Sequence, residues 1–213
     1  MSTIQVIKYL TKQDNLCLRA AVGHFATSNC HSNYYIDVVQ HKARLSEAKA
    51  VAKKICSYYY PNTIVDTILC LDGTEVIGTC LAEAITKSDM VNMNAHKSVY
   101  VVTPETVNGG QLLFRDNIVP MIYGKNVLIL AVSVASGKTV EAAVDAIKYY
   151  GGAVAGVSAI FSTAKTCRGM PVRSVFDPND LEGYQCYPAH ECPLCKAGVK
   201  LDALVNSHGC SLL

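Results

Sequence analysis

Short apolar runs alternate along this chain with segments of helical periodicity, and this alternation constrains the fold more than any other feature. Four runs have the length and composition of buried strands: 64–71, 99–102, 127–130 and 153–161. Three segments place apolar residues at three- and four-residue spacing, as amphipathic helices do: 44–59, 76–86 and 139–148. Strands that alternate with helices form βαβ units, so the sequence predicts an α/β fold with a parallel sheet covered on both faces.

The remaining segments carry weaker patterns. Residues 3–22 mix apolar and polar positions, and we expect a first helix there. Residues 34–38 follow a polar turn and predict a short strand. Residues 103–124 form a long connection with a Gly-Gly pair and two prolines, for which we expect a flap or a β-hairpin.

The composition restricts what such a domain can bind. The 213-residue chain has a formal net charge of +2, too mild for a nucleic-acid surface. Its longest apolar run, 127–132, is too short to cross a bilayer, and its start lacks the apolar stretch of a signal peptide. Ten cysteines in such a chain indicate reduced, mostly buried thiols. We therefore expect a cytoplasmic protein with neither a nucleic-acid nor a membrane partner.

The turn between the run 127–130 and the following helix is the first candidate binding site. A helix N-terminus presents unpaired backbone N–H groups and a partial positive charge, which suit a phosphate. Glycine allows close backbone approach there, hydroxyl groups can donate, and a lysine adds a cation. The predicted phosphate site comprises Ser133, Val134, Ala135, Ser136, Gly137, Lys138 and Thr139. The alternative is an ordinary capped turn, with Ser136 or Thr139 as the N-cap.

The substring Ser136-Gly137-Lys138-Thr139 also matches the end of the P-loop motif, GxxxxGK[ST]. That motif requires a glycine at position 132, where this chain has Val132. Without that glycine the loop cannot wrap a phosphate in the same way, so the sequence disfavours a P-loop nucleotidase.

Three separated segments of the chain resemble the type I phosphoribosyltransferases and, within them, the orotate phosphoribosyltransferases. They are Gly23-His24-Phe25 with Ser28-x-x-His31-Ser32-x-x-Tyr35, then 126–152, and finally Cys192-Pro-Leu-Cys195-x-x-Gly198. The first segment is one residue shorter than usual after the phenylalanine. In order and spacing the resemblance covers most of the chain.

The resemblance implies one domain over 1–213, with a core over about 41–179 and a hood from about 1–40 and 180–213. It implies that the core binds phosphoribosyl pyrophosphate (PRPP) with Mg²⁺, that the hood holds a base, and that the protein is a homodimer. The implied function is binding of a phosphoribosyl or nucleotide phosphate group, with phosphoribosyl transfer to a base such as orotate in pyrimidine nucleotide metabolism.

A further turn stands where the family has its pyrophosphate loop: Asp72, Gly73, Thr74 and Glu75. Its two carboxylates would repel a bare diphosphate, although Mg²⁺ could bridge them. The alternative is a polar turn in which Asp72 caps the following helix.

Two departures from the family pattern concern catalysis. Family members have consecutive carboxylates after the central strand, where this chain has Ala131-Val132, which cannot accept hydrogen bonds from ribose hydroxyls. The flap segment 103–114 contains no Lys, Arg or His, Arg115 is the nearest cation, and Glu105 has the wrong sign for a diphosphate. The sequence therefore assigns no catalytic residue. The alternative function is a catalytically inactive ligand-binding or regulatory protein on the same scaffold, or a structural partner that binds nothing at this loop.

The C-terminal tail carries four soft ligands within ten residues: Cys186, His190, Cys192 and Cys195. Thiolates and imidazoles suit a tetrahedral Zn²⁺, but strong zinc motifs pair two knuckles and this tail has one CxxC. We therefore expect no metal, and a tail packed into the hood with free thiols. His24 and His31 either line a base pocket or are hydrogen-bonded hood histidines, and the second interpretation is favoured.

Overall fold

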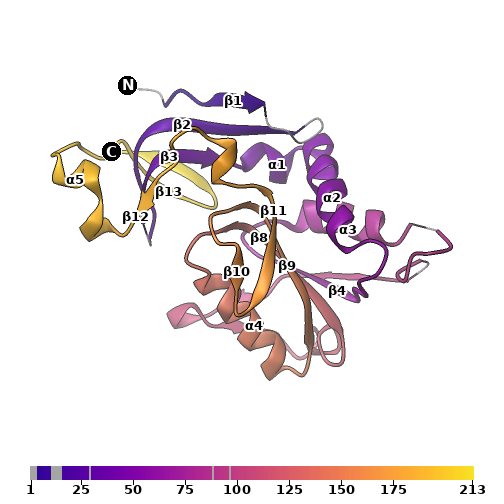
Figure 1. The fold of residues 1–213 in the computed structure, drawn as a ribbon. Coiled ribbons are helices and arrows are strands. Elements are labelled where there is room, and N and C mark those ends of the chain that lie inside the picture. Colours follow the sequence, from indigo (N-terminus) through magenta and orange to yellow (C-terminus); the bar gives the residue numbers. More distant parts are fainter. Residues whose placement is uncertain (1–3, 11–15, 29, 88, 96) are drawn as a thin grey trace. The chain divides into compact units, whose positions relative to one another are not determined.

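The computed structural model describes residues 4–10, 16–28, 30–87, 89–95 and 97–213, shown as a ribbon in Figure 1. The chain divides into two compact units. One unit, here called the terminal unit, combines the two ends of the chain, residues 1–40 and 176–213. The other, the central unit, contains residues 41–175.

The central unit is built around a largely parallel sheet in the order β10-β11-β9-β8-β4-β5. Its strands are β4 (Thr67–Cys70), β5 (Tyr100–Val102), β8 (Asn126–Val134), β9 (Ala153–Ser162), β10 (Thr166–Cys167) and β11 (Met170–Phe176). The pairs β4–β5, β4–β8 and β8–β9 are parallel, whereas β10 and β11 form an antiparallel hairpin. The predicted α/β class with a parallel sheet is confirmed, and β8 extends four residues beyond the run that predicted it.

Helices cover both faces of this sheet, with α2 (Leu45–Tyr59) and α3 (Glu75–Ile85) on one side and α4 (Lys138–Tyr149) on the other (Figure 1). The alternation of side chains along the strands explains this arrangement. Leu69 and Ile129 pack in the apolar cluster that includes Val144 and Ile147 of α4. Cys70 follows Leu69 in β4 and points to the opposite face, towards α3. A Cβ at Gly78 of α3 would lie 2.4 Å from the Cys70 sulfur. All three predicted helices are confirmed, and their ends agree within one residue.

The expected first helix over 3–22 is wrong. The described part of this segment contains the strands β1 (Ile7–Leu10) and β2 (Cys17–Ala26). At the start of β2 the buried residues Leu18 and Ala20 alternate with partly exposed ones, which is the period of a strand. Alanine favours helix when no partner is present, but antiparallel pairing with β1 on one edge and β3 on the other overrides that preference.

The terminal unit is a small sheet in the order β12-β3-β2-β13-β14, with β1 on the other end of β2. The strands not yet given are β3 (His31–Asp37), β12 (Cys186–Tyr187), β13 (Ala203–Asn206) and β14 (Gly209–Leu212). The predicted strand near 34–38 is confirmed as β3. Two short helices complete the description, α1 (Val39–Ala43), which crosses the unit boundary, and α5 (Pro193–Lys196) in the tail. One apolar cluster of this unit comprises Ala21, Phe25, Tyr35 and Ala203, and Leu18, Ala20 and Tyr34 of the same sheet are also buried.

The connection 103–124 contains the expected hairpin. β6 (Glu105–Thr106) pairs antiparallel with β7 (Leu112–Leu113). The Arg115 guanidinium donates two hydrogen bonds to Glu105, at 2.7 and 2.8 Å, and these hold the pKa of Glu105 below its ordinary value. The cation nearest the flap is therefore already paired with the flap's own carboxylate.

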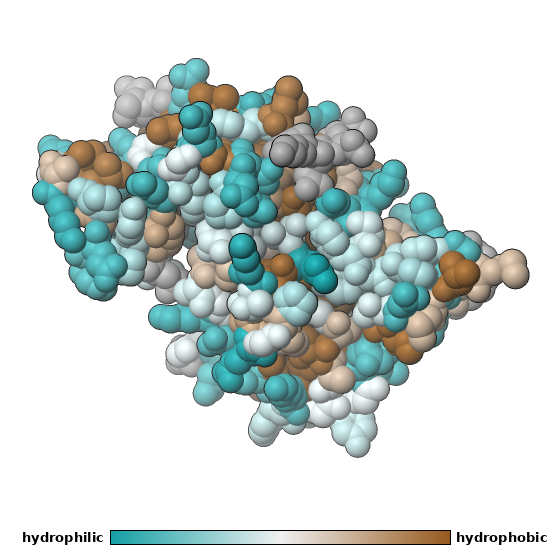
Figure 2. Space-filling view, in the orientation of Figure 1, coloured by the Kyte–Doolittle hydropathy of each residue, from teal (hydrophilic) through white to brown (hydrophobic). Residues whose placement is uncertain are grey.

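On the face shown in Figure 2, apolar residues are mostly interspersed with polar ones. A small apolar patch covers the tip of the segment that follows α3, where Met90, Val91 and Met93 are exposed (Figure 2). Over the described ranges, the structure has no helix with the length and apolar character that a membrane crossing requires.

Asp66 ties the start of β4 to the start of β8. Burial opposes ionisation of its carboxyl, but hydrogen bonds from the backbone and side-chain nitrogens of Asn126, at 2.9 and 2.7 Å, outweigh it and lower the pKa. A carboxyl with a depressed folded-state pKa stabilises the fold above its unfolded pKa, and that contribution is lost as pH falls through the folded value.

We expect Asp66→Asn, which removes the charge at nearly constant shape, to lower the Tm at pH 7 and progressively less below the ordinary carboxyl pKa of 3.8. Thermal unfolding followed by circular dichroism across this pH range measures the effect. Asp116→Asn, at an exposed position, is the control. A loss of Tm that is the same at every pH would contradict the charge-based explanation.

Candidate functional site

Two turns meet at the carboxyl edge of the central sheet. They follow β4 and β8, which are parallel neighbours with Cys70 opposite Leu130. The Leu71 N–H donates to the Leu130 carbonyl at 2.8 Å, and the buried Thr74 hydroxyl donates to the same carbonyl at 3.1 Å. The predicted pyrophosphate loop and the predicted phosphate turn are therefore adjacent, at the edge where parallel α/β sheets bind ligands.

The end of β8, the turn after it and the start of α4 present polar groups to solvent. Ser133 at the end of β8, Ser136 in the turn, and Lys138 and Thr139 in the first turn of α4 are exposed, whereas Gly137 is buried. Gly137 is itself the N-cap of α4, so the alternative of a turn capped by Ser136 or Thr139 is wrong. Its φ of 79° lies in the left-handed region that favours glycine, and a Cβ would lie 3.3 Å from the Cys167 sulfur. Because the N-cap residue is a glycine, no N-cap side chain bonds to the backbone N–H groups at the start of α4.

The turn after β4 is also held in an unusual backbone conformation. Asp72 and Gly73 have φ of 56° and 79°, and Thr74 is the N-cap of α3, so the interpretation of Asp72 as that cap is wrong. The Lys42 ammonium donates to the Asp72 carbonyl at 2.9 Å. Sequence reasoning missed Lys42, because it lies thirty positions before the loop and matches no motif. The Glu75 carboxylate accepts a hydrogen bond from the Thr103 hydroxyl at 3.1 Å.

The residues beneath these turns are uncharged. Ala131 and Val132 are 1% and 2% exposed, and Ala131 packs in the apolar cluster of the sheet. At the end of the neighbouring strand, burial raises the pKa of Cys70 to about 12, so this thiol stays neutral at physiological pH. Neither the strand end of β8 nor that of β4 therefore supplies an anion that could accept hydrogen bonds from ribose hydroxyls.

A second group of reactive side chains lies in the terminal unit. The ligand atoms of His24, His31, Cys192 and Cys195 all lie within 4.8 Å of one another. His24 and Cys192 are buried, His31 is half-buried and Cys195 is exposed. Burial and the neighbouring His24 lower the pKa of His31, which favours its neutral imidazole.

The structure separates the four ligands that the tail sequence suggested. Cys192 and Cys195 join this cluster, but the Cys186 thiol is hydrogen-bonded to Cys30, and this bond lowers the pKa of Cys30 to about 6. His190 is exposed beside Glu191, with its Nε2 3.2 Å from the carboxylate. The two histidines come instead from β2 and β3, where no metal-ligand spacing is visible in the sequence.

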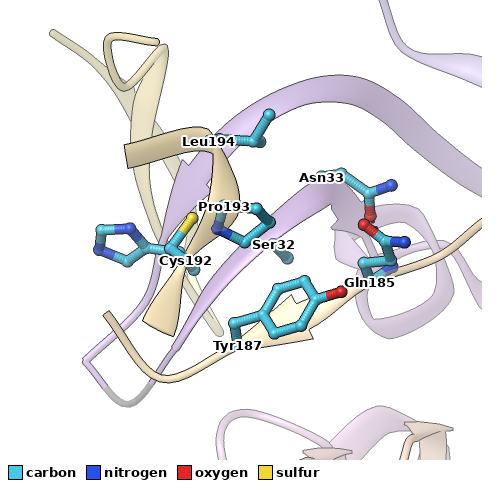
Figure 3. A pocket seen from close by; sticks show the side chains of 8 residues that line it. Ser32, Asn33, Gln185, Tyr187, Cys192, Pro193 and Leu194 are labelled. Atoms are coloured by element: carbon cyan, nitrogen blue, oxygen red, sulfur yellow. Dashed lines mark hydrogen bonds between the residues drawn. The ribbon is translucent and has the colours of Figure 1, made fainter. Parts of the chain in front are cut away.

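A small hollow adjoins the cluster, lined by His31, Ser32, Asn33, Gln185, Tyr187, Cys192, Pro193 and Leu194. Figure 3 shows Cys192, Pro193 and Leu194 along one side of it and the amide side chains of Asn33 and Gln185 close together at the other. The Gln185 backbone N–H donates to the Asn33 side-chain oxygen at 2.7 Å, and β12 pairs with β3 directly afterwards. The tail is thus bound to β3 by backbone pairing as well as by the cluster.

Comparison with known proteins gives a consistent family relationship, although no family model matches the chain. An orotate phosphoribosyltransferase of Chlorobium phaeobacteroides is 28% identical over 188 residues, which cover 85% of this chain and 86% of that protein. A phosphoribosyltransferase structure from Corynebacterium diphtheriae aligns over 76% of this chain and 90% of its own, with a TM-score of 0.55 and 16% identity.

The orotate phosphoribosyltransferase of Mycobacterium tuberculosis H37Rv, in its complex with PRPP, aligns over 69% of this chain and 82% of its own, with a TM-score of 0.52 and 16% identity. The structural matches establish the fold, and the sequence match covers most of both proteins. The predicted resemblance is confirmed: the chain has the fold of the phosphoribosyltransferases, and over most of its length its sequence is similar to that of an orotate phosphoribosyltransferase.

Proposed function

We propose that this chain binds the 5′-phosphate of a phosphoribosyl compound, PRPP or a nucleoside monophosphate, at the turn 133–139. The observation that carries this proposal is the exposed, glycine-capped start of α4 at the carboxyl edge of the sheet, in a chain with this fold. A relative with the same fold has been solved with PRPP, which supports the choice of ligand class.

The groups that would hold the phosphate are the backbone N–H groups of the first turn of α4, the hydroxyls of Ser136 and Thr139, and the Lys138 ammonium. An anion at a helix N-terminus is stabilised by about 0.3–1 kcal/mol at an exposed site, and direct hydrogen bonds add to this. Because Gly137 has no side chain, the phosphate oxygens can approach the backbone closely.

A diphosphate would extend towards the neighbouring turn after β4. The Lys42 ammonium provides positive charge there, and the carboxylates of Asp72 and Glu75 are oxygen ligands of the kind that Mg²⁺ accepts together with substrate phosphates. In this proposal the ion arrives with the diphosphate, which offsets the repulsion between the loop carboxylates and the ligand.

We further propose that binding takes place without efficient phosphoribosyl transfer. As the diphosphate leaves, the sugar gains positive charge, and the residues beneath it would have to hold the ribose and stabilise that charge. Ala131 and Val132 can do neither, and the flap cation Arg115 is paired with Glu105. A regulatory or ligand-sensing role therefore agrees better with the site than a working orotate phosphoribosyltransferase. The homodimer and the cytoplasmic location stay predictions from the sequence.

We expect ribose 5-phosphate to raise the Tm of the chain in a saturable manner, while ribose alone leaves it unchanged. A ligand at one hundred times its Kd stabilises the folded state by about 2.7 kcal/mol. Gly137→Ala is expected to weaken this binding at least tenfold, because a Cβ strains the left-handed backbone and approaches Cys167. Differential scanning fluorimetry with a ligand titration measures both effects.

Gly124→Ala is the matched control, because Gly124 also has a positive φ, of 65°, but lies in the turn before β8 with open space around it. Gly124→Ala therefore introduces the same kind of backbone strain, but at the end of β8 opposite the proposed phosphate site. If ribose 5-phosphate, uridine monophosphate and PRPP all left the Tm unchanged, or if Gly137→Ala bound them normally, the proposed site would be wrong.

A further inference from the structure

We propose that His24, His31, Cys192 and Cys195 bind one Zn²⁺ ion, which fastens the C-terminal tail to the β2–β3 hairpin. The chain itself supplies four ligands, which fills a tetrahedral coordination sphere. Sites of this closed kind are structural, since they leave no position for substrate or water.

Four of the six distances between the ligand atoms are close to those that a tetrahedral zinc ion requires, and all six are within 4.8 Å. The Nε2 atom of His24 lies 3.3 Å from His31 Nδ1, 3.4 Å from Cys192 Sγ and 3.6 Å from Cys195 Sγ. The His31 Nδ1 atom lies 3.2 Å from Cys195 Sγ. Zn–N bonds of about 2.0–2.1 Å and Zn–S bonds of about 2.3 Å place tetrahedral ligand atoms about 3.3–3.8 Å apart. The cluster therefore needs little rearrangement to accept the ion.

Hydrogen bonding alone does not account for this convergence. The other ring nitrogen of His24, Nδ1, lies 3.0 Å from the Val199 carbonyl oxygen, which can only accept. The proton is therefore on Nδ1, and Nε2 carries a single lone pair directed at the cluster. One lone pair cannot accept from His31, Cys192 and Cys195 together, whereas a cation attracts all four atoms. The carbonyl of Val199 then acts as the outer partner that orients a metal-bound histidine.

The local fold explains how His24 reaches the cluster. The pairing of β2 with β3 shifts between Val22 and Phe25, a bulge that contains Gly23 and His24. The His24 N–H donates to the Asp202 carboxylate at 2.7 Å, and the Asp202 N–H donates back to the His24 carbonyl at 2.8 Å. A Cβ at Gly23 would lie 2.7 Å from that carboxylate oxygen and 2.8 Å from the Phe25 ring, so a larger residue would have to displace these side chains.

The two cysteines form a compact knuckle. Cys192 stands immediately before α5, and Pro193 begins that helix, so Cys192 and Cys195 lie one turn apart on the same side. The ligand types select the ion. Thiolate and imidazole disfavour Mg²⁺ and Ca²⁺, which prefer oxygen. A two-iron cluster would place the cysteine pair and the histidine pair on different irons, whereas here His24 Nε2 lies within 3.6 Å of both cysteine sulfurs.

The test is metal analysis of the full chain purified without added zinc, for which we expect one zinc per chain. Cys195→Ser, at an exposed position, and His31→Gln are expected to lose that zinc. Cys186→Ser and His190→Gln remove the tail ligands that lie outside the cluster and are expected to keep it. Loss of zinc from Cys186→Ser or His190→Gln, with retention in Cys195→Ser, would assign the ion to the tail alone and overturn this ligand set.

A second measurement keeps the proposal testable if a ligand variant fails to fold. Exchange of the wild-type chain into Co²⁺ is expected to give the visible absorption bands of tetrahedral, thiolate-bound cobalt, and added Zn²⁺ is expected to remove them. A folded wild-type chain that contains no metal as purified and takes up neither ion would exclude the site. Gly137→Ala is expected to keep its zinc, so failure of the phosphate site and failure of the metal site give different results.

Discussion

Removal of zinc is expected to lower the Tm of this chain by about 8–16 °C. An ion that binds only the folded state stabilises it by about 4 kcal/mol when its free concentration is a thousand times the Kd. In a chain of this size each kcal/mol shifts the Tm by about 2–4 °C. The ion would join the C-terminal tail to β2 and β3, so its loss is expected to destabilise the terminal unit in particular.

Differential scanning calorimetry with and without a strong chelator measures this effect. Cys192→Ser is expected to unfold at the low temperature of the metal-free chain and to be insensitive to the chelator. Cys186→Ser is the matched control and is expected to respond to the chelator as the wild type does. An unchanged Tm after zinc has been shown to leave the protein would mean that the ion does not stabilise the fold.

Turnover of PRPP and orotate in the presence of Mg²⁺ is expected to be about 10²–10⁴ times slower than that of a working orotate phosphoribosyltransferase assayed in parallel. The missing carboxylate pair removes two charge-assisted hydrogen bonds to the ribose, each worth about 1.5–3 kcal/mol. Their sum is about 3–6 kcal/mol, and about 1.4 kcal/mol in the barrier corresponds to a factor of ten in rate.

A spectrophotometric assay that follows orotate consumption measures this rate, with the Chlorobium phaeobacteroides relative as the reference. Any residual turnover is expected to fall in Gly137→Ala and to persist in Gly124→Ala. A rate within tenfold of the reference would show that other groups replace the carboxylates, and the chain would then be a transferase. Residual turnover that Gly137→Ala leaves unchanged would not arise at this site.

The sequence by itself determined the parallel strands and the helices of the central unit, although it did not predict the β10–β11 hairpin. Buried strands of a parallel sheet are continuous apolar runs, and amphipathic helices repeat every three to four residues, so 44–59, 127–130 and 139–148 could be assigned locally. The turn that we propose as the phosphate site could be located in the same way, because a strand, a glycine-containing turn and a helix are contiguous. The absence of the acidic pair at Ala131-Val132 was likewise visible in the sequence, since it depends on residue type alone.

The tertiary structure alone decided the terminal unit and its ligand cluster. The β1–β2 segment became strand rather than helix because pairing partners override the propensity of an alanine-containing segment. His24 and Cys192 are 168 positions apart, and the bulge that directs His24 inwards depends on Asp202 from the other end of the chain. Local spacing had pointed to Cys186 and His190 instead, because ligands close in sequence are the ones that a motif can reveal. Which side chains meet around one point depends on how β2, β3 and the tail pair, and periodicity along the chain does not contain that information.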